Sequence, residues 1–114
     1  MATPANTPEP PYFAVIFTST RTADQSGYET TAARMLELAA QQAGFLGVES
    51  VRETLGITVS YWDSLEAIAA WKANGEHQLA QQVGRERWYQ CYHTRIARVE
   101  RDYRAEQDVA DEPG

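Results

Sequence analysis

The residues best suited to chemistry gather in one stretch of the chain, between Trp71 and Arg85. His77 could accept a proton from a phenolic substrate, because imidazole is the side chain whose ordinary pKa lies nearest to neutrality. Trp71 could wall a pocket for a flat aromatic ligand. Asn74 could orient a substrate oxygen or O2, and Arg85 could stabilise a developing anion. These residue types predict a proton-abstracting site for a small aromatic compound.

Each of these residues also has a structural explanation, and both explanations stay open. A single His next to an Asn-Gly pair is often a cap or a surface residue, and Asn before Gly is first of all a turn former. Trp71 could pack in the core against a sheet. Arg85 could lie on a solvated rim or pair with Glu86.

Three more aromatic residues, Trp62, Trp88 and Tyr92, are candidates for substrate binding, and all three fall in segments that we interpret as strands. Side chains alternate between the two faces of a strand, so Trp88 and Tyr92 should share one face and His93 should take the other. The pattern leaves open which face lines a cavity.

Metal chemistry has little support in the sequence. His77 and His93 stand alone, and no His or carboxylate cluster has the spacing of metal ligands. Cys91 is the only cysteine, which excludes an intrachain disulfide and a cysteine zinc site, and we expect it to be a packing residue. Glycine-rich phosphate loops are absent as well. We therefore expect any catalysis to need no tightly bound cofactor.

The composition is that of a single folded domain of an acidic protein. A chain of 114 residues has room for one core, and 43% of the residues are hydrophobic. The formal net charge of -6 argues against nucleic-acid binding, which normally needs a basic surface. No apolar run approaches the roughly 20 residues that cross a bilayer, and the N-terminus does not have the pattern of a signal peptide. We expect a cytoplasmic protein.

The two ends of the chain differ from its middle. Four of the five prolines fall within residues 1–11, which we expect to be a flexible leader. Residues 104–114 are rich in acidic side chains without apolar periodicity, which is typical of a flexible terminus. The folded domain should therefore span residues 12–103.

The order of elements in this domain predicts an α+β protein with the ferredoxin-like βαββαβ arrangement, in which both helical segments cover one face of a four-stranded antiparallel sheet. Ser26 with Glu29, and Asp63 with Glu66, have the spacing of helix caps. Asn74-Gly75 should break the second helix, and Gly84 should end the helical segment. The expected strands are Tyr12–Ser19, Phe45–Glu53, Ile57–Trp62 and Trp88–Arg101, and the expected helices are 26–44, 63–73 and 76–83.

A sheet of this kind predicts a homodimer. The first strand is apolar on both sides, whereas the helices can cover only one face. A second copy of the chain is the simplest cover for the other face. The last segment would reach about 45 Å as a strand, so part of it should pair with the partner. We expect a twofold symmetric dimer in which two sheets face each other as a barrel.

Several segments resemble the antibiotic biosynthesis monooxygenase family. The stretch Gly44–Glu49 is similar to the family's "PGF-LG" opening of the second strand, with Ala43 in the place of the common Pro. Tyr61–Ala67 with Trp71-Lys72 is similar to its "W-S-EA---W" pattern. The continuation, residues 76–103, is similar to a mostly uncharacterised bacterial branch of the family. The resemblance covers the whole domain and implies a dimeric α+β barrel.

The resemblance also implies an activity. Characterised quinone-forming members deprotonate a phenolic substrate, whose anion reduces O2 without a cofactor inside a water-excluding pocket. We therefore expect a cofactor-independent monooxygenase for a small aromatic or polyketide-like compound. One alternative is a non-enzymatic dimeric binding or stress-related protein whose aromatic residues all belong to the core.

A haem-binding or haem-degrading member is a further alternative. That pattern uses a His in the second helical region together with an Asn and a Trp. His77 lies closer to Trp71 than the pattern requires, and Gln81 stands nearer the expected position. The first strand reads Phe13-Ala14-Val15 where the Asn is expected. These departures disfavour haem.

Overall fold

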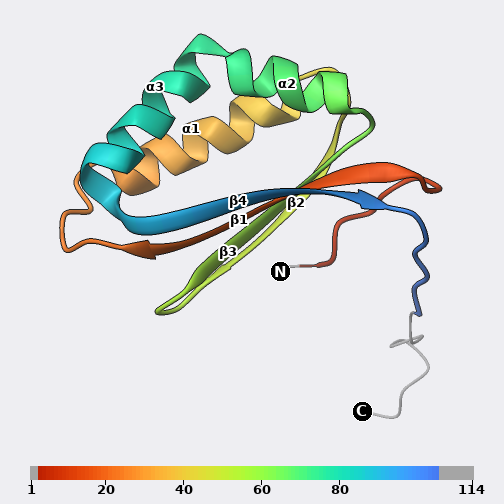
Figure 1. Ribbon diagram of the computed structural model, residues 1–114, viewed down its shortest axis with the longest axis horizontal. Coiled ribbons are helices and arrows are strands. Elements are labelled where there is room, and N and C mark those ends of the chain that lie inside the picture. The colour runs from red at the N-terminus through yellow and green to blue at the C-terminus, as the bar shows by residue number, and fades with distance from the viewer. Residues whose placement is uncertain (1–2, 106–114) are drawn as a thin grey trace, which may run out of the picture.

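The structure is a computed structural model that describes residues 3–105. It confirms the expected ferredoxin-like α+β fold, in which four antiparallel strands form a sheet in the order β2-β3-β1-β4. All of the helices lie on one side of this sheet (Figure 1). The elements are β1 (Tyr12–Arg21), α1 (Tyr28–Ala40), β2 (Phe45–Arg52), β3 (Gly56–Trp62), α2 (Leu65–Ala73), α3 (Gly75–Val83), one π-helical turn (Gly84–Trp88) and β4 (Tyr89–Val99).

The first helix begins differently from the sequence prediction. The expected cap between Ser26 and Glu29 does not form, because Gly27 is the N-cap and has a positive φ of 75° that favours glycine. The backbone carbonyl of Ser26 instead accepts a hydrogen bond of 2.9 Å from the indole Nε1 of Trp88. The start of α1 is therefore tied to the residue that precedes β4.

The second helical segment breaks where the sequence indicated. Asn74 separates α2 from α3, and its side chain caps the start of α3. The cap of α2 was predicted one residue too early, since Ser64 rather than Asp63 accepts the hydrogen bond from Ala67 N, at 3.0 Å. Ser and Asp are both good N-caps, so neighbouring candidates cannot be separated by residue type alone.

Gly84 does not end the helical segment as predicted. The chain continues through the π-helical turn, and Trp88 lies at the end of that turn instead of on a strand. The last strand is accordingly shorter at both ends than the predicted Trp88–Arg101. Trp88 is one of the most buried side chains, with 5% of its surface exposed.

The two faces of the sheet have different surroundings. The helix-side face contains Phe13, Val15 and Phe17, which alternate along β1. It also contains Trp62 of β3, which stands opposite Phe13. The other face, which we call the open face, contains Ala14, Ile16, Thr18, Ile57, Val59, Tyr61, Ala97 and Val51.

Residues 3–11 lie on the side of the sheet away from the helices (Figure 1). The backbone amide of Ala5 donates a 2.8 Å hydrogen bond to Glu49, whose other carboxylate oxygen accepts one of 2.7 Å from Tyr61. Residues 3–11 therefore cover one part of the open face. Most of the predicted C-terminal segment, residues 106–114, lies outside the described residues.

Candidate functional site

A column of stacked rings joins the sheet to the junction of α2 and α3. The imidazole of His77 stacks on the indole of Trp71, with ring centroids 4.1 Å apart and an interplanar angle of 10°. Trp71 also stacks with Trp62, at 6.1 Å and 26°. Phe45 meets Trp62 edge to face at 5.4 Å. Trp62, which is completely buried, thus anchors the column in the core.

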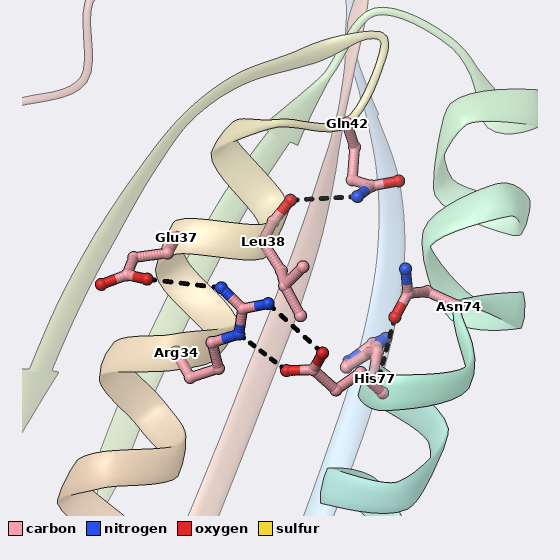
Figure 2. Close-up of polar contacts among 7 residues, drawn as sticks. Arg34, Glu37, Leu38, Gln42, Asn74 and His77 are labelled. Atoms are coloured by element: carbon pink, nitrogen blue, oxygen red, sulfur yellow. Dashed lines mark hydrogen bonds and ion pairs between the residues drawn. The ribbon is translucent and has the colours of Figure 1, made fainter.

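Asn74 and Trp71 fix the position of His77. The Asn74 side-chain oxygen accepts a 3.0 Å hydrogen bond from the backbone amide of His77, as Figure 2 shows. The His77 ring nitrogen Nδ1 lies 3.0 Å from the backbone carbonyl oxygen of Trp71. A carbonyl oxygen can only accept, so Nδ1 carries the hydrogen in the neutral ring. The lone pair is then on Nε2, the atom that can act as a base.

The surroundings also keep His77 neutral. Burial lowers the pKa of its imidazole below the ordinary value of 6.5, although the hydrogen bond to the Trp71 carbonyl acts in the opposite direction. At neutral pH the ring is therefore uncharged. A neutral imidazole with a free Nε2 lone pair can remove a proton without first having to lose one.

An ion pair holds α3 against α1 beside this site. Arg34 of α1 lies 2.8 Å from the Glu76 carboxylate of α3, and Glu37 approaches the same guanidinium at 3.5 Å (Figure 2). All of these side chains are well exposed, so water screens their charges and the pairs contribute little to stability. Their main effect is on the placement of the first turn of α3, which carries His77.

The predicted site residues fall into separate places. Trp62, Trp71, Asn74 and His77 come together as described. Arg85 lines an open cavity of about 510 Å³ on the outer side of α3, with Lys72, Gln78 and Gln82 among its neighbours. Neither Trp71 nor His77 lines that cavity.

Trp88 lines another cavity, of about 450 Å³, between α1 and α3. Tyr92 lies on the helix-side face of β4 and stacks on Phe17 at 5.6 Å. Tyr92 keeps 44% of its surface exposed, because the helices do not cover this strand. As the alternation predicted, His93 takes the opposite face and pairs with Thr18.

Sequence reasoning missed a second polar group, which we call the arginine–tyrosine cluster and define as Arg21, Tyr28, Arg52 and Tyr89. The guanidinium of Arg21 lies over the ring of Tyr28, 3.6 Å from its centroid. Tyr28 and Tyr89 meet edge to face at 6.2 Å. Arg52 reaches from the end of β2 to donate hydrogen bonds to Ser19 of β1.

The cluster perturbs both of its phenols. Burial alone would raise the pKa of Tyr28, but Arg21, Tyr89 and the charge of Arg52 together lower it below the ordinary value. Burial raises the pKa of Tyr89, and its neighbour Tyr28 raises it further. Gly56 stands opposite Arg52 and leaves room for its side chain, because a Cβ at Gly56 would collide with that guanidinium.

Two other findings concern the described residues as a whole. Within residues 3–105, no three His, Cys, Asp or Glu side chains gather closely enough to hold a metal ion. No helix in the same range is long and apolar enough to cross a membrane.

The fold defines an α+β protein of the ferredoxin-like class, and the stacked column of Trp62, Trp71 and His77 lies on the helix side of its sheet. Residues 11–83 match the profile of the family described as antibiotic biosynthesis monooxygenase. The YqjZ protein of Bacillus subtilis, described as uncharacterized, is 57% identical over 99 residues, which cover 85% of this chain and 87% of that protein. The chain therefore belongs to the antibiotic biosynthesis monooxygenase family.

Solved structures share the fold at low sequence identity. A Pseudomonas aeruginosa protein aligns with a TM-score of 0.65 and 17% identity, over 84% of this chain and 99% of that one. SnoaB of Streptomyces nogalater, described as a cofactor-independent oxygenase, aligns with a TM-score of 0.62 and 15% identity, over 90% of this chain and all of SnoaB.

Proposed function

We propose that this protein is a cofactor-independent monooxygenase that acts on a small aromatic or polyketide-like substrate. The observation that carries the proposal is the His77 imidazole, which is held neutral against Trp71 with Nε2 as its basic atom. Membership of the monooxygenase family supports the reaction class. The likeness in fold to SnoaB supports the absence of a cofactor.

The proposed reaction needs one proton acceptor and O2. His77 Nε2 takes the proton of a phenol whose para carbon is unsubstituted, and the electron-rich anion reduces O2. One oxygen atom becomes the new carbonyl of a para-quinone, and the other leaves as water together with the hydrogen of the para carbon and the phenolic proton. The protein supplies the base and its orientation.

The neighbours of His77 have supporting roles in this proposal. The side-chain oxygen of Asn74 is occupied by the amide of His77, which leaves its NH2 group to donate to a substrate oxygen. Trp71 fixes the imidazole plane by stacking. Arg85 lies at a different cavity, so the proposal gives it no contact with the substrate.

The proposed enzyme works as a homodimer whose two open faces pack together. That face carries apolar side chains on every strand, and Val51 is one of them, with 65% of its surface exposed. Residues Gln90–Arg98 of the edge strand β4 are all exposed. A monomer seldom leaves such a surface in water, and a twofold partner would cover both the apolar face and the strand edge.

Oxygen uptake tests the proposal. Purified protein, treated with a chelator, is mixed with a panel of phenols and naphthols that have a free para position, and dissolved O2 and quinone formation are followed together. We expect at least one compound to consume O2 and yield quinone in equal amounts. No uptake above buffer over the panel, or uptake without quinone, would contradict the proposed reaction.

A further inference from the structure

The arginine–tyrosine cluster lies at the opposite end of β1 from the His77 column. Phe13, near the start of β1, pairs with Trp62, whereas Ser19 pairs with Gly56 beside Arg52. About 20 Å of extended strand separates the two positions. The cluster is thus a separate place in the fold from the His77 column.

The two arginines of the cluster have no carboxylate partner in the part of the chain that the structure describes. Within residues 3–105 the ion pairs all involve Arg34, although 16 acidic residues give the whole chain a net charge of -6. Arg21 and Arg52 are both partly buried. A guanidinium that is partly withdrawn from water is costly without a negative charge nearby.

The cluster also has hydrogen-bonding capacity to spare. Arg52 directs Nη1 and Nη2 to Ser19, which leaves several of its N–H groups for another acceptor. The Nε of Arg21 is buried and has no hydrogen-bond partner among residues 3–105. Two arginine forks of this kind match the planar geometry of a carboxylate.

An aromatic surface adjoins these cations. Tyr89 contacts Tyr28 of the cluster on one side and Phe17, at 5.2 Å, on the other. Tyr92 continues the surface by stacking on Phe17, and nearly half of it is exposed. A ligand held by the arginines could lay a flat ring against the exposed face of Tyr92.

We propose that the arginine–tyrosine cluster binds the carboxylate of a small aromatic acid, whose ring lies against Tyr92. The arginines supply the positive charge and the planar N–H donors that a carboxylate accepts. In the competing arrangement no ligand binds, and Tyr28 itself is a phenolate whose negative charge neutralises the guanidinium groups. The lowered pKa of Tyr28 fits both arrangements, so the test separates them.

The probe is benzoate, titrated into the full chain by isothermal calorimetry and followed by amide chemical shifts in NMR. Benzamide serves as the uncharged ring and inorganic phosphate as the anion without a ring. We expect benzoate to bind more tightly than either, and to shift the amides of Arg21, Tyr28 and Arg52. Binding that is no better than benzamide, or weaker than phosphate, would overturn the proposal.

Variants test the contacts. Arg52→Gln should weaken benzoate binding about tenfold or more, because it removes a charge-assisted pair. Arg101→Gln is the control: it makes the same charge change at an exposed residue and should leave benzoate binding unchanged. If Arg52→Gln does not fold, Tyr28→Phe is the variant that tests the proposal, and it should weaken benzoate binding about two- to tenfold. If the variant that tests the proposal binds benzoate as tightly as wild type does, the proposal is overturned. So would phenolate absorbance at neutral pH that disappears in Tyr28→Phe.

Discussion

The His77 ring lies nearly parallel to the Trp71 ring at 4.1 Å, and its Nδ1 is 3.0 Å from the backbone carbonyl of the same tryptophan. One residue therefore fixes both the plane and the tautomer of the imidazole. This double constraint leaves Nε2 as the basic atom.

Replacement of His77 should remove the base. We expect His77→Gln to lower the rate of O2 uptake by about a hundredfold or more, which is the usual contribution of a positioned general base. His93→Gln is the matched control, because His93 lies on the other face of the sheet. Equal rates for wild type and His77→Gln would remove His77 from the mechanism. Light scattering on both variants checks that the oligomeric state is unchanged.

The pH dependence of the rate should reflect the buried environment of His77. Because burial lowers the pKa of the imidazole below 6.5, the base should stay unprotonated at pH values where an exposed histidine is already charged. The midpoint of the fall in rate should therefore lie below pH 6.5. A profile with a midpoint at or above 6.5 would contradict the assignment.

Stability should depend on pH in the same direction. Above 6.5 the His77 ring is neutral in both folded and unfolded chains and contributes no slope. As pH falls below 6.5 the unfolded chain binds the proton first, so the free energy of unfolding decreases until the pH reaches the lower folded pKa. Denaturant titrations of wild type and His77→Gln should differ in slope in that window. Parallel curves would show that the pKa of His77 is not lowered by folding.

Asn74 should stabilise the start of α3. Asn74→Ala removes the acceptor for the His77 amide and should cost about 1 kcal/mol of unfolding free energy. Asn74→Asp keeps the acceptor and should restore most of that stability, which chemical denaturation can measure. An alanine variant as stable as wild type would show that the cap contributes little.

The sequence was a good guide to this part of the fold, because its signals are local. The break at Asn74-Gly75 and the closeness of Trp71, Asn74 and His77 follow from a single helix junction. The periodic apolar strands likewise predicted the sheet. Composition and spacing could not predict that Trp71 would stack with Trp62, since this contact depends on where β3 meets the helix layer.

Other features depended on contacts between segments distant in the chain. The N-cap of α1 is Gly27 instead of Ser26, and the Ser26 carbonyl accepts a hydrogen bond from Trp88, 62 residues away, which no local pattern indicates. Arg21, Tyr28, Arg52 and Tyr89 come from four different elements or their ends, so no spacing in the sequence marks them as a group. Arg85 and Trp88 follow α3 closely in sequence, yet they line cavities on different sides of it.

The open face should hold two chains together. Ile16→Glu places a charge at the centre of that face and should convert a particle of about twice 12.8 kDa into one of 12.8 kDa. Leu36→Glu makes the same kind of change on α1, at a side chain that is already 49% exposed, and should leave the dimer intact. Light scattering coupled to size exclusion measures both. A wild-type mass near 12.8 kDa would contradict the dimer.

The most direct test of the proposed function traces the oxygen atom. Chelator-treated protein is given a phenolic substrate from the uptake panel under ¹⁸O2, and the quinone product is analysed by mass spectrometry. With the wild-type protein the product should gain one ¹⁸O atom per molecule, and His77→Gln should form almost no product. A product whose new oxygen comes from water, or equal labelled product from both proteins, would contradict the proposed function.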